Sequence, residues 1–337
     1  MVFLARAIAL LIAFLLPPTS GIAQHLPGAS EPLTIAVIGK TKHDSFYEQS
    51  FAGCEAFANS KSDVKCLYDG PELFQDIREQ VIATKAMIER GVDGIIVSTT
   101  DSKYLTQNAL VLARKKGIPV ITFDSDLLPE HQEYRLAYVG TNNFEFGVAL
   151  GEYAERFKRE GNTQICIQSG HTSTPNLNER IRGVRFALSG KADNSRLAGE
   201  NGWVEYYRCP FYTLGKREMA LRQLELLLNK QVPVYIAVAG FAQFSPDYIK
   251  RISPYKPQIN SQSTVIISAD TEQVQLDALN AGLSTVNIGQ RPFEMGRLST
   301  QMLYEYIKEN KLPEQQLNYL DFHYCTRQNA QSCISHD

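Results

Sequence analysis

Three aspartates follow two apolar runs in the stretch from residue 93 to residue 126 (DGIIVSTTDSKYLTQNALVLARKKGIPVITFDSD). Asp101 ends the polar turn TTD, and Asp124 and Asp126 belong to the turn DSD. Their carboxylates can accept hydrogen bonds from hydroxyl groups, and such charge-assisted bonds are the stronger kind. The runs themselves indicate two buried strands with an amphipathic helix between them. Since ligands bind beyond the carboxyl ends of strands in an open parallel sheet, both acidic turns are predicted to face one cleft.

The other reactive side chains form no catalytic pattern. His43 and Asp44 have the types of a general base pair, but no nucleophile motif such as G-x-S-x-G accompanies them. The turn GKTKHD after the first apolar run is not a phosphate-binding loop, and the histidines near Cys325 and Cys333 are too scattered for a zinc site. His171, in SGHTST, is expected either to contact a ligand or to be exposed on the surface. We therefore predict binding without catalysis, cofactor or metal.

Strands of about five residues alternate with helices along the whole chain, which is the pattern of a parallel α/β fold. Strands are expected at 33–39, 64–68, 95–98, 120–123, 136–139, 164–168, 203–209, 234–239, 264–269, 286–288 and 319–324. Helices are expected at 46–59, 76–90, 105–116, 144–159, 179–188, 216–228, 247–252, 273–281 and 295–310. The pattern restarts after Arg135, which predicts two α/β lobes, and the chain is expected to cross between them near residues 140, 290 and 320.

Composition agrees with a globular chain of two domains. The chain has 337 residues, of which 44% are hydrophobic. Its net charge of −2 gives no broad basic surface for nucleic acid.

The first residues have the pattern of a signal peptide over 1–23. Arg6 precedes the apolar run AIALLIAFLL, which is too short to span a bilayer, and the small residues of Gly21-Ile22-Ala23 fit cleavage after Ala23. We expect an exported, periplasmic protein; an uncleaved anchor is the alternative.

Six cysteines in an exported chain indicate disulfides. Cys54 and Cys66 flank a predicted helix end and turn, Cys166 and Cys209 each close a predicted strand, and Cys325 and Cys333 lie close together in the sequence. Six cysteines allow 15 pairings, and the sequence alone does not choose among them. Buried free thiols are the alternative.

Five segments, in this order, resemble the periplasmic sugar-binding proteins of the ribose-binding type, the type I substrate-binding proteins of ABC importers. They are GIPVITFDSD, RLAYVGTNNFEFGVALGEY, NERIRGVRFAL, VIISADTEQVQLDALNAG and NIGQRPFEMG. The resemblance covers about residues 33–325. It implies two similar doubly wound parallel-sheet lobes, joined by a three-strand hinge, that close on a small ligand. The expected lobes are 33–140 plus 291–318 and 141–290 plus 319–325, followed by a tail at 326–337.

The resemblance implies ligand contacts in the first lobe from Asp44, Phe46, Tyr47 and Asp124. An aromatic face covers the C–H side of a sugar ring while polar groups bind its hydroxyls. The alternatives are core packing for the two aromatic residues and a helix N-cap for Asp124.

In the second lobe the resemblance implies contacts from Asp270, from Gln290 and from Phe211 or Tyr212. The chain also departs from the ribose binders, because Ser125 and Asn178 stand where they carry arginines, and Ala239, with Phe241 nearby, stands where they carry asparagine. The expected polar inventory of the pocket has acceptors in excess and no obvious cation: Asp44, Asp101, Asp124, Asp126, Asn142, Asn178, Asp270 and Gln290. It disfavours an anionic ligand and favours a neutral sugar or polyol, with a cationic ligand as the alternative.

These observations predict a monomeric solute-binding protein that delivers a neutral carbohydrate or polyol to an ABC permease. The alternative is a sensory adaptor that presents its closed form to a membrane receptor kinase or chemoreceptor. An enzyme is disfavoured because no nucleophile or metal site was found. Asp124→Ala and Asp270→Ala are each expected to weaken ligand binding without unfolding the protein.

Overall fold

The computed structural model describes residues 31–333, and residues 32–333 belong to one compact unit. The predicted signal peptide, its cleavage site and the end of the predicted tail lie outside the described residues. Within residues 31–333, no helix has the length and apolar character needed to cross a membrane.

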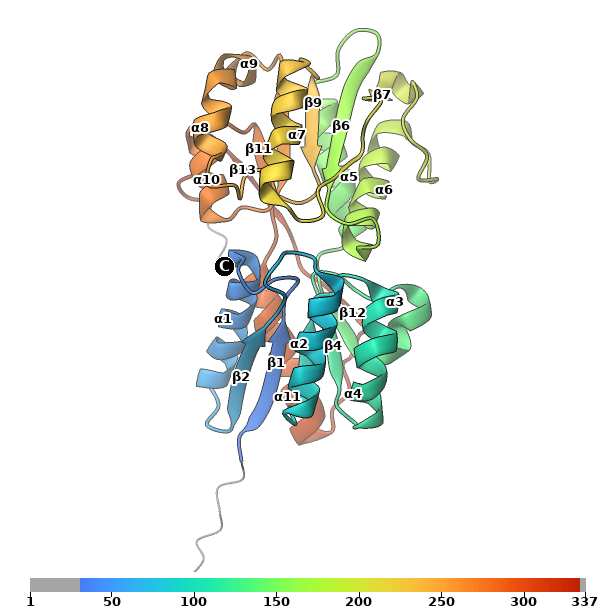
Figure 1. Cartoon of the computed structure of the whole chain (residues 1–337), viewed down its shortest axis with the longest axis vertical. Coiled ribbons are helices and arrows are strands. Elements are labelled where there is room, and N and C mark those ends of the chain that lie inside the picture. The colour runs from blue at the N-terminus through green and yellow to red at the C-terminus, as the bar shows by residue number, and fades with distance from the viewer. Residues whose placement is uncertain (1–30, 334–337) are drawn as a thin grey trace, which may run out of the picture. The chain divides into compact units, whose positions relative to one another are not determined.

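The first sheet has the strand order β12-β5-β4-β3-β1-β2, and all its neighbouring strands are parallel. Its strands are β1 (Leu33–Ile38), β2 (Val64–Asp69), β3 (Gly94–Val97), β4 (Val120–Phe123), β5 (Ala137–Gly140) and β12 (Leu317–Tyr319). Figure 1 labels β1, β2, β4 and β12 among them. Strands β3, β4 and β5 are buried along their whole length, as expected for parallel strands with both faces covered.

Helices cover both faces of this sheet, and alternate residues of β1 pack against helices on opposite faces. Ile35 and Val37 pack in one core cluster with α1 and α11, while Ala36 and Ile38 pack in another with α2 and α4. The helices are α1 (Ser45–Asn59), α2 (Ile77–Glu89), α3 (Ser102–Leu105), α4 (Val111–Lys115) and α11 (Pro292–Glu309). A π-helical turn (Thr106–Leu110) joins α3 to α4, so the single helix predicted at 105–116 begins earlier and is interrupted.

The second sheet has the order β13-β11-β10-β9-β6-β7, with β8 also paired to β6. Its strands are β6 (Thr163–Ser169), β7 (Trp203–Glu205), β8 (Phe211–Tyr212), β9 (Val234–Ala237), β10 (Val265–Ala269), β11 (Val286–Gly289) and β13 (His323–Thr326). Only β13 runs antiparallel to its neighbour among these described strands. The flanking helices are α5 (Asn143–Glu155), α6 (Pro175–Ser189), α7 (Arg217–Asn229), α8 (Tyr248–Ile252), α9 (Lys256–Asn260) and α10 (Gln273–Asn280).

Three connections join the two sheets: β5 to α5, β11 to α11, and β12 to β13. The predicted fold of two parallel-sheet lobes with a three-strand hinge is therefore confirmed, whereas the residue limits proposed for the lobes stay a prediction. Two predicted strands were wrong in detail. The strand expected at 319–324 is divided between β12 and β13, one in each sheet, and the strand expected at 203–209 ends at Glu205.

All six cysteines are paired in the structure, as Cys54–Cys66, Cys166–Cys209 and Cys325–Cys333. The first bond ties α1 to the neighbouring strand β2. A ring nitrogen of His323 and the two sulfur atoms of the third pair lie within 4.8 Å of one another, but both sulfur atoms are held in a disulfide.

Candidate functional site

A cavity lies where the carboxyl ends of the strands of the two sheets face each other. Its volume is about 40 Å³, which is well below the roughly 300–1,000 Å³ of typical small-molecule pockets. Its walls come from both lobes: Lys40, Asp44, Phe46, Tyr47, Phe74, Gln75, Asp124, Asn176, Leu177, Arg180, Ala239, Gly240, Phe241, Phe244, Asp270 and Gln290.

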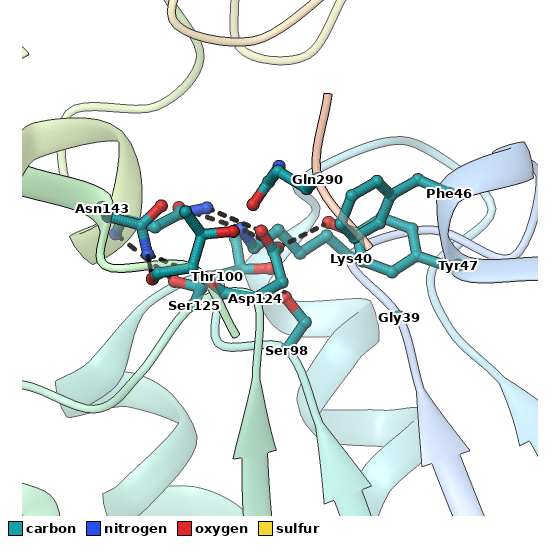
Figure 2. Close-up of polar contacts among 12 residues, drawn as sticks. Gly39, Lys40, Phe46, Tyr47, Ser98, Thr100, Asp124, Ser125, Asn143 and Gln290 are labelled. Carbon is teal, nitrogen blue, oxygen red and sulfur yellow. Dashed lines mark hydrogen bonds and ion pairs between the residues drawn. The ribbon is translucent and has the colours of Figure 1, made fainter. Parts of the chain in front are cut away.

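Asp124 is the centre of the polar contacts in this cavity (Figure 2). It follows β4 directly and has a left-handed backbone conformation, with φ of 56°. From its own lobe, its carboxylate accepts hydrogen bonds from Lys40 Nζ at 3.0 Å, from Ser98 Oγ at 2.8 Å and from the Tyr47 hydroxyl at 3.3 Å. Because Lys40 and Ser98 follow β1 and β3, three adjacent strand ends converge on one carboxylate.

The second lobe contributes two further contacts to Asp124, both from α6. Asn176 Nδ2 donates to the carboxylate at 3.0 Å, and Arg180 Nη2 lies 3.6 Å from it. Asn176 also accepts a hydrogen bond from Lys40 at 3.0 Å. The buried carboxylate of Asp124 thus contacts side chains of both lobes.

Close packing of α5 against α6 places Arg180. A Cβ at Gly147 would lie 2.2 Å from the Arg180 carbonyl oxygen, so any larger residue there would push the helices apart. The guanidinium lies over the Phe146 ring and donates to Asn143 Oδ1, to the Val238 carbonyl and to Gln290 Oε1 at 2.8–2.9 Å. These bonds fix the positive charge at the cavity wall.

The charges of Asp124 and Lys40 depend on each other. Burial by itself raises the pKa of the Asp124 carboxyl, but the charges of Lys40 and Arg180 together with the hydrogen bonds hold that pKa below its usual value. Burial lowers the pKa of the Lys40 ammonium, against the attraction of Asp124. We therefore describe Asp124 as a carboxylate that is ionised at neutral pH.

Asp270 and Gln290 form the second-lobe side of the cavity. Asp270 follows β10 with a φ of 72° and accepts a hydrogen bond from Gln290 Nε2 at 2.8 Å. Burial raises the pKa of the Asp270 carboxyl, and the nearby Arg180 opposes that rise. Gln290 thus links the acid of this lobe to Arg180.

Asp44 is both a helix cap and a cavity residue. Its carboxylate accepts a hydrogen bond from the Phe46 backbone N–H at 3.0 Å, which caps α1, and another from Arg217 of the opposite lobe at 3.2 Å. Burial raises the pKa of Asp44 to about 6, against the charge of Arg217.

Aromatic rings form the apolar part of the cavity. Phe46 and Tyr47 meet edge to face with ring centroids 5.3 Å apart, and Phe74 meets Phe241 across the lobes at 4.9 Å. Such rings can cover the C–H face of a sugar.

Of the predicted site residues, the structure therefore brings seven to the cavity: Asp44, Phe46, Tyr47, Asp124, Phe241, Asp270 and Gln290. The other six predicted residues are not among those that line it. Asp101 caps α3 through the Tyr104 N–H, Ser125 is buried and its Oγ accepts a hydrogen bond from the Asn176 backbone N–H, and Phe211 packs in the core of the second lobe.

Three of these six residues line a different groove, near the hinge: Asp126, Asn142 and Asn178. Asp126 is paired there with Arg135, whose Nε and Nη2 both donate at 2.6 Å. Asn142 caps α5. Asp126 therefore already has a buried cation as its partner.

The expectation that the pocket has no cation is wrong, because Lys40 and Arg180 both line it. The rule that pointed to the aspartates, namely a position just after a strand, also applies to Lys40. Arg180 stands in the segment NERIRGVRFAL that carries the family resemblance. Phe74 and Gln75 lie in the loop between β2 and α2, which shows no recognisable pattern. His171 lines an outer groove rather than the cavity.

Residues 35–311 match the family described as periplasmic binding protein domain, and the chain belongs to this family. The D-ribose/D-allose-binding protein of Pseudomonas aeruginosa is 25% identical over 175 residues, which are 51% of this chain and 53% of that protein. The match thus spans about half the length of this curated relative.

Two solved structures have the same fold. A solute-binding protein from Burkholderia graminis, in complex with D-arabinose, has a TM-score of 0.74 at 23% identity and covers 90% of this chain and 99% of its own. One from Agrobacterium vitis, with bound D-fucose, has a TM-score of 0.77 at 18% identity and covers 89% and 97%. At these identities the likeness shows the fold alone.

Proposed function

We propose that this protein is a periplasmic solute-binding protein that captures a small neutral carbohydrate or polyol between its lobes. The observation that carries this proposal is the charge balance of the cleft. Three acids line it (Asp44, Asp124 and Asp270), together with the cations Lys40 and Arg180, and a third cation, Arg217, pairs with Asp44 from the outer groove. Since every charge already has an opposite one nearby, a charged ligand would leave one charge buried without compensation. A neutral ligand avoids this cost.

The chemistry of the walls supports a sugar in particular. Carboxylate, amide, ammonium and guanidinium groups offer acceptors and donors for hydroxyls, while Phe46, Tyr47 and Phe241 offer apolar faces. The relatives named above bind ribose or allose, arabinose and fucose, all of which are neutral.

We further propose that the closed protein delivers its ligand to an ABC permease. The two solved relatives are described as solute-binding proteins of ABC transporters, which favours a permease over a sensory receptor as the partner. A ligand that contacts both lobes stabilises the closed form, whose paired surfaces a permease can recognise.

A thermal-shift screen of the purified protein tests the ligand class. We expect a rise in melting temperature with one or more of D-ribose, D-allose, D-arabinose, D-fucose and myo-inositol, because a ligand that binds only the folded state stabilises it. D-Galacturonate and putrescine serve as an anionic and a cationic comparison. A rise with either charged compound, and with none of the neutral ones, would contradict the proposal.

A further inference from the structure

The loop between β2 and α2 carries two residues, Phe74 and Gln75, that separate the cavity from an outer groove. Both line the cavity, and both also line the groove, whose other walls include His43, His171 and Arg217. The loop therefore closes one end of the cavity.

The side-chain amide of Gln75 is buried without a hydrogen-bond partner. Gln75 is 5% exposed, and within the described part of the chain neither Oε1 nor Nε2 is hydrogen-bonded. Gln80, on the adjacent helix, differs: its amide donates to the Gly39 and Ser98 carbonyls and accepts from the Thr100 N–H. An unpaired buried amide destabilises a folded protein and is uncommon, so the one at Gln75 requires an explanation.

The surrounding structure holds this amide in place. The Gln75 backbone is left-handed, with φ of 60°, and its N–H donates to the Lys40 carbonyl at 3.0 Å. Across the lobes the amide lies against Gly170, where an added Cβ would be 2.3 Å from Oε1 and 2.8 Å from Nε2. The neighbouring Phe74 ring packs on Phe241 of the opposite lobe. Contacts from both lobes thus hold the amide in place beside the cavity that Gln75 lines.

We propose that Gln75 is a ligand-binding residue whose amide pairs with one donor and one acceptor hydroxyl of the bound carbohydrate. This inference rests on the proposed function. A primary amide offers both a donor and an acceptor, and two neighbouring hydroxyls of a sugar offer the complementary pair. Because the amide is uncharged, it selects for hydroxyls without disturbing the charge balance of Asp124, Lys40 and Arg180. The ligand class is therefore a neutral sugar with a vicinal hydroxyl pair directed toward Phe74 and Gln75.

Calorimetric titration of Gln75→Met tests this role, with whichever of D-ribose, D-allose, D-arabinose and D-fucose binds the wild type best. Affinity is expected to fall about tenfold to a hundredfold, as for the loss of hydrogen bonds in a buried site. The melting temperature of the ligand-free variant is expected to equal or exceed that of the wild type, because an unpaired buried amide has been removed. A purely structural glutamine would give the opposite change in melting temperature.

Gln231→Met is the matched control, since Gln231 has a similar left-handed φ of 53° but is exposed. It is expected to keep wild-type affinity. Gln75→Asn is a second variant, because asparagine tolerates the left-handed backbone and withdraws the amide by one methylene; it too is expected to lose affinity.

The outcomes separate the two proposals. A wild type that is stabilised by D-galacturonate or putrescine, and by none of the neutral compounds, overturns the proposed function together with this inference. A wild type that binds, with unchanged affinity in Gln75→Met and Gln75→Asn, overturns the role of Gln75 alone. A lowered melting temperature in both ligand-free variants assigns Gln75 a structural role and overturns the inference as well.

Discussion

At Asp124, one carboxylate accepts hydrogen bonds from four side chains of both lobes: Lys40, Tyr47, Ser98 and Asn176. The position of Asp124 at a strand end made it predictable as a ligand contact. Its partners were not predictable, because Asn176 and Arg180 approach it from the other lobe, 52 and 56 residues away in the sequence. Substitution of Asp124 is therefore expected to affect the stability of the protein as well as ligand binding.

Asp124→Ala is expected to lower the free energy of unfolding by about 3–5 kcal/mol, because it leaves the Lys40 ammonium buried without its partner. This revises the expectation that the substitution affects binding alone. Urea unfolding measures the change. The double variant Lys40→Met/Asp124→Ala is expected to recover much of the stability, because the buried ammonium is removed together with its partner. Wild-type stability in Asp124→Ala alone would contradict the ion-pair account.

Glu272 is expected to make the stability of the folded protein depend on pH. It is buried, it receives a hydrogen bond from Gln49 of the other lobe at 2.5 Å, and Asp44 and Asp270 are nearby acids. Burial raises its pKa from 4.5 to about 7, opposed by hydrogen bonds from Ser45 and Gln49. The folded state therefore holds this proton at pH values where the unfolded chain has lost it.

The sign of the effect follows from this difference. Stability should fall as the pH rises from about 4.5 to 7, by on the order of 2 kcal/mol from this group. Unfolding by urea at several pH values, in the wild type and in Glu272→Gln, measures it. Glu272→Gln is expected to show a smaller slope; equal slopes would rule out this carboxyl as the source.

At the scale of elements, the apolar runs determined most of the fold. Strands such as β3 and β4 are short, fully buried and β-branched, so they were predictable from the sequence. The division of 319–324 between β12 and β13 was not, because both pieces have strand-like residues and only the tertiary structure assigns them to different sheets. The same limit applies to the acidic turns, since a carboxylate after a strand can either face a ligand or cap the next helix.

Asp101 was predicted to contact the ligand but caps a helix, α3, instead. Its carboxylate caps α3 by accepting from the Tyr104 N–H at 2.8 Å. Asp101→Ala should therefore lower stability by about 1 kcal/mol and leave sugar affinity unchanged. Denaturant unfolding and calorimetric titration of the same preparation check both parts. If Asp101→Ala lost sugar affinity but kept its stability, Asp101 would be a ligand contact rather than a helix cap.

For the whole molecule, the central feature is that both lobes contribute to one cavity and contact each other around it. Lys40 bonds to Asn176, Asp44 to Arg217, and Gln49 to Glu272. Parallel strands direct the ends of β1, β4, β9, β10 and β11 to this boundary, which is why sequence reasoning located the site. Loop residues such as Phe74 and Gln75 follow no periodic pattern, and only the structure places them there.

Calorimetric titration of a neutral sugar into the wild type and Asp270→Ala tests the central claim most directly, with the exposed Asp193→Ala as the matched control. We predict one binding site per chain in the wild type and in Asp193→Ala, with affinity about tenfold to a hundredfold weaker in Asp270→Ala, as for the loss of hydrogen bonds to a charged group. Equal affinity in all three proteins would contradict the assignment of this cleft as the sugar-binding site.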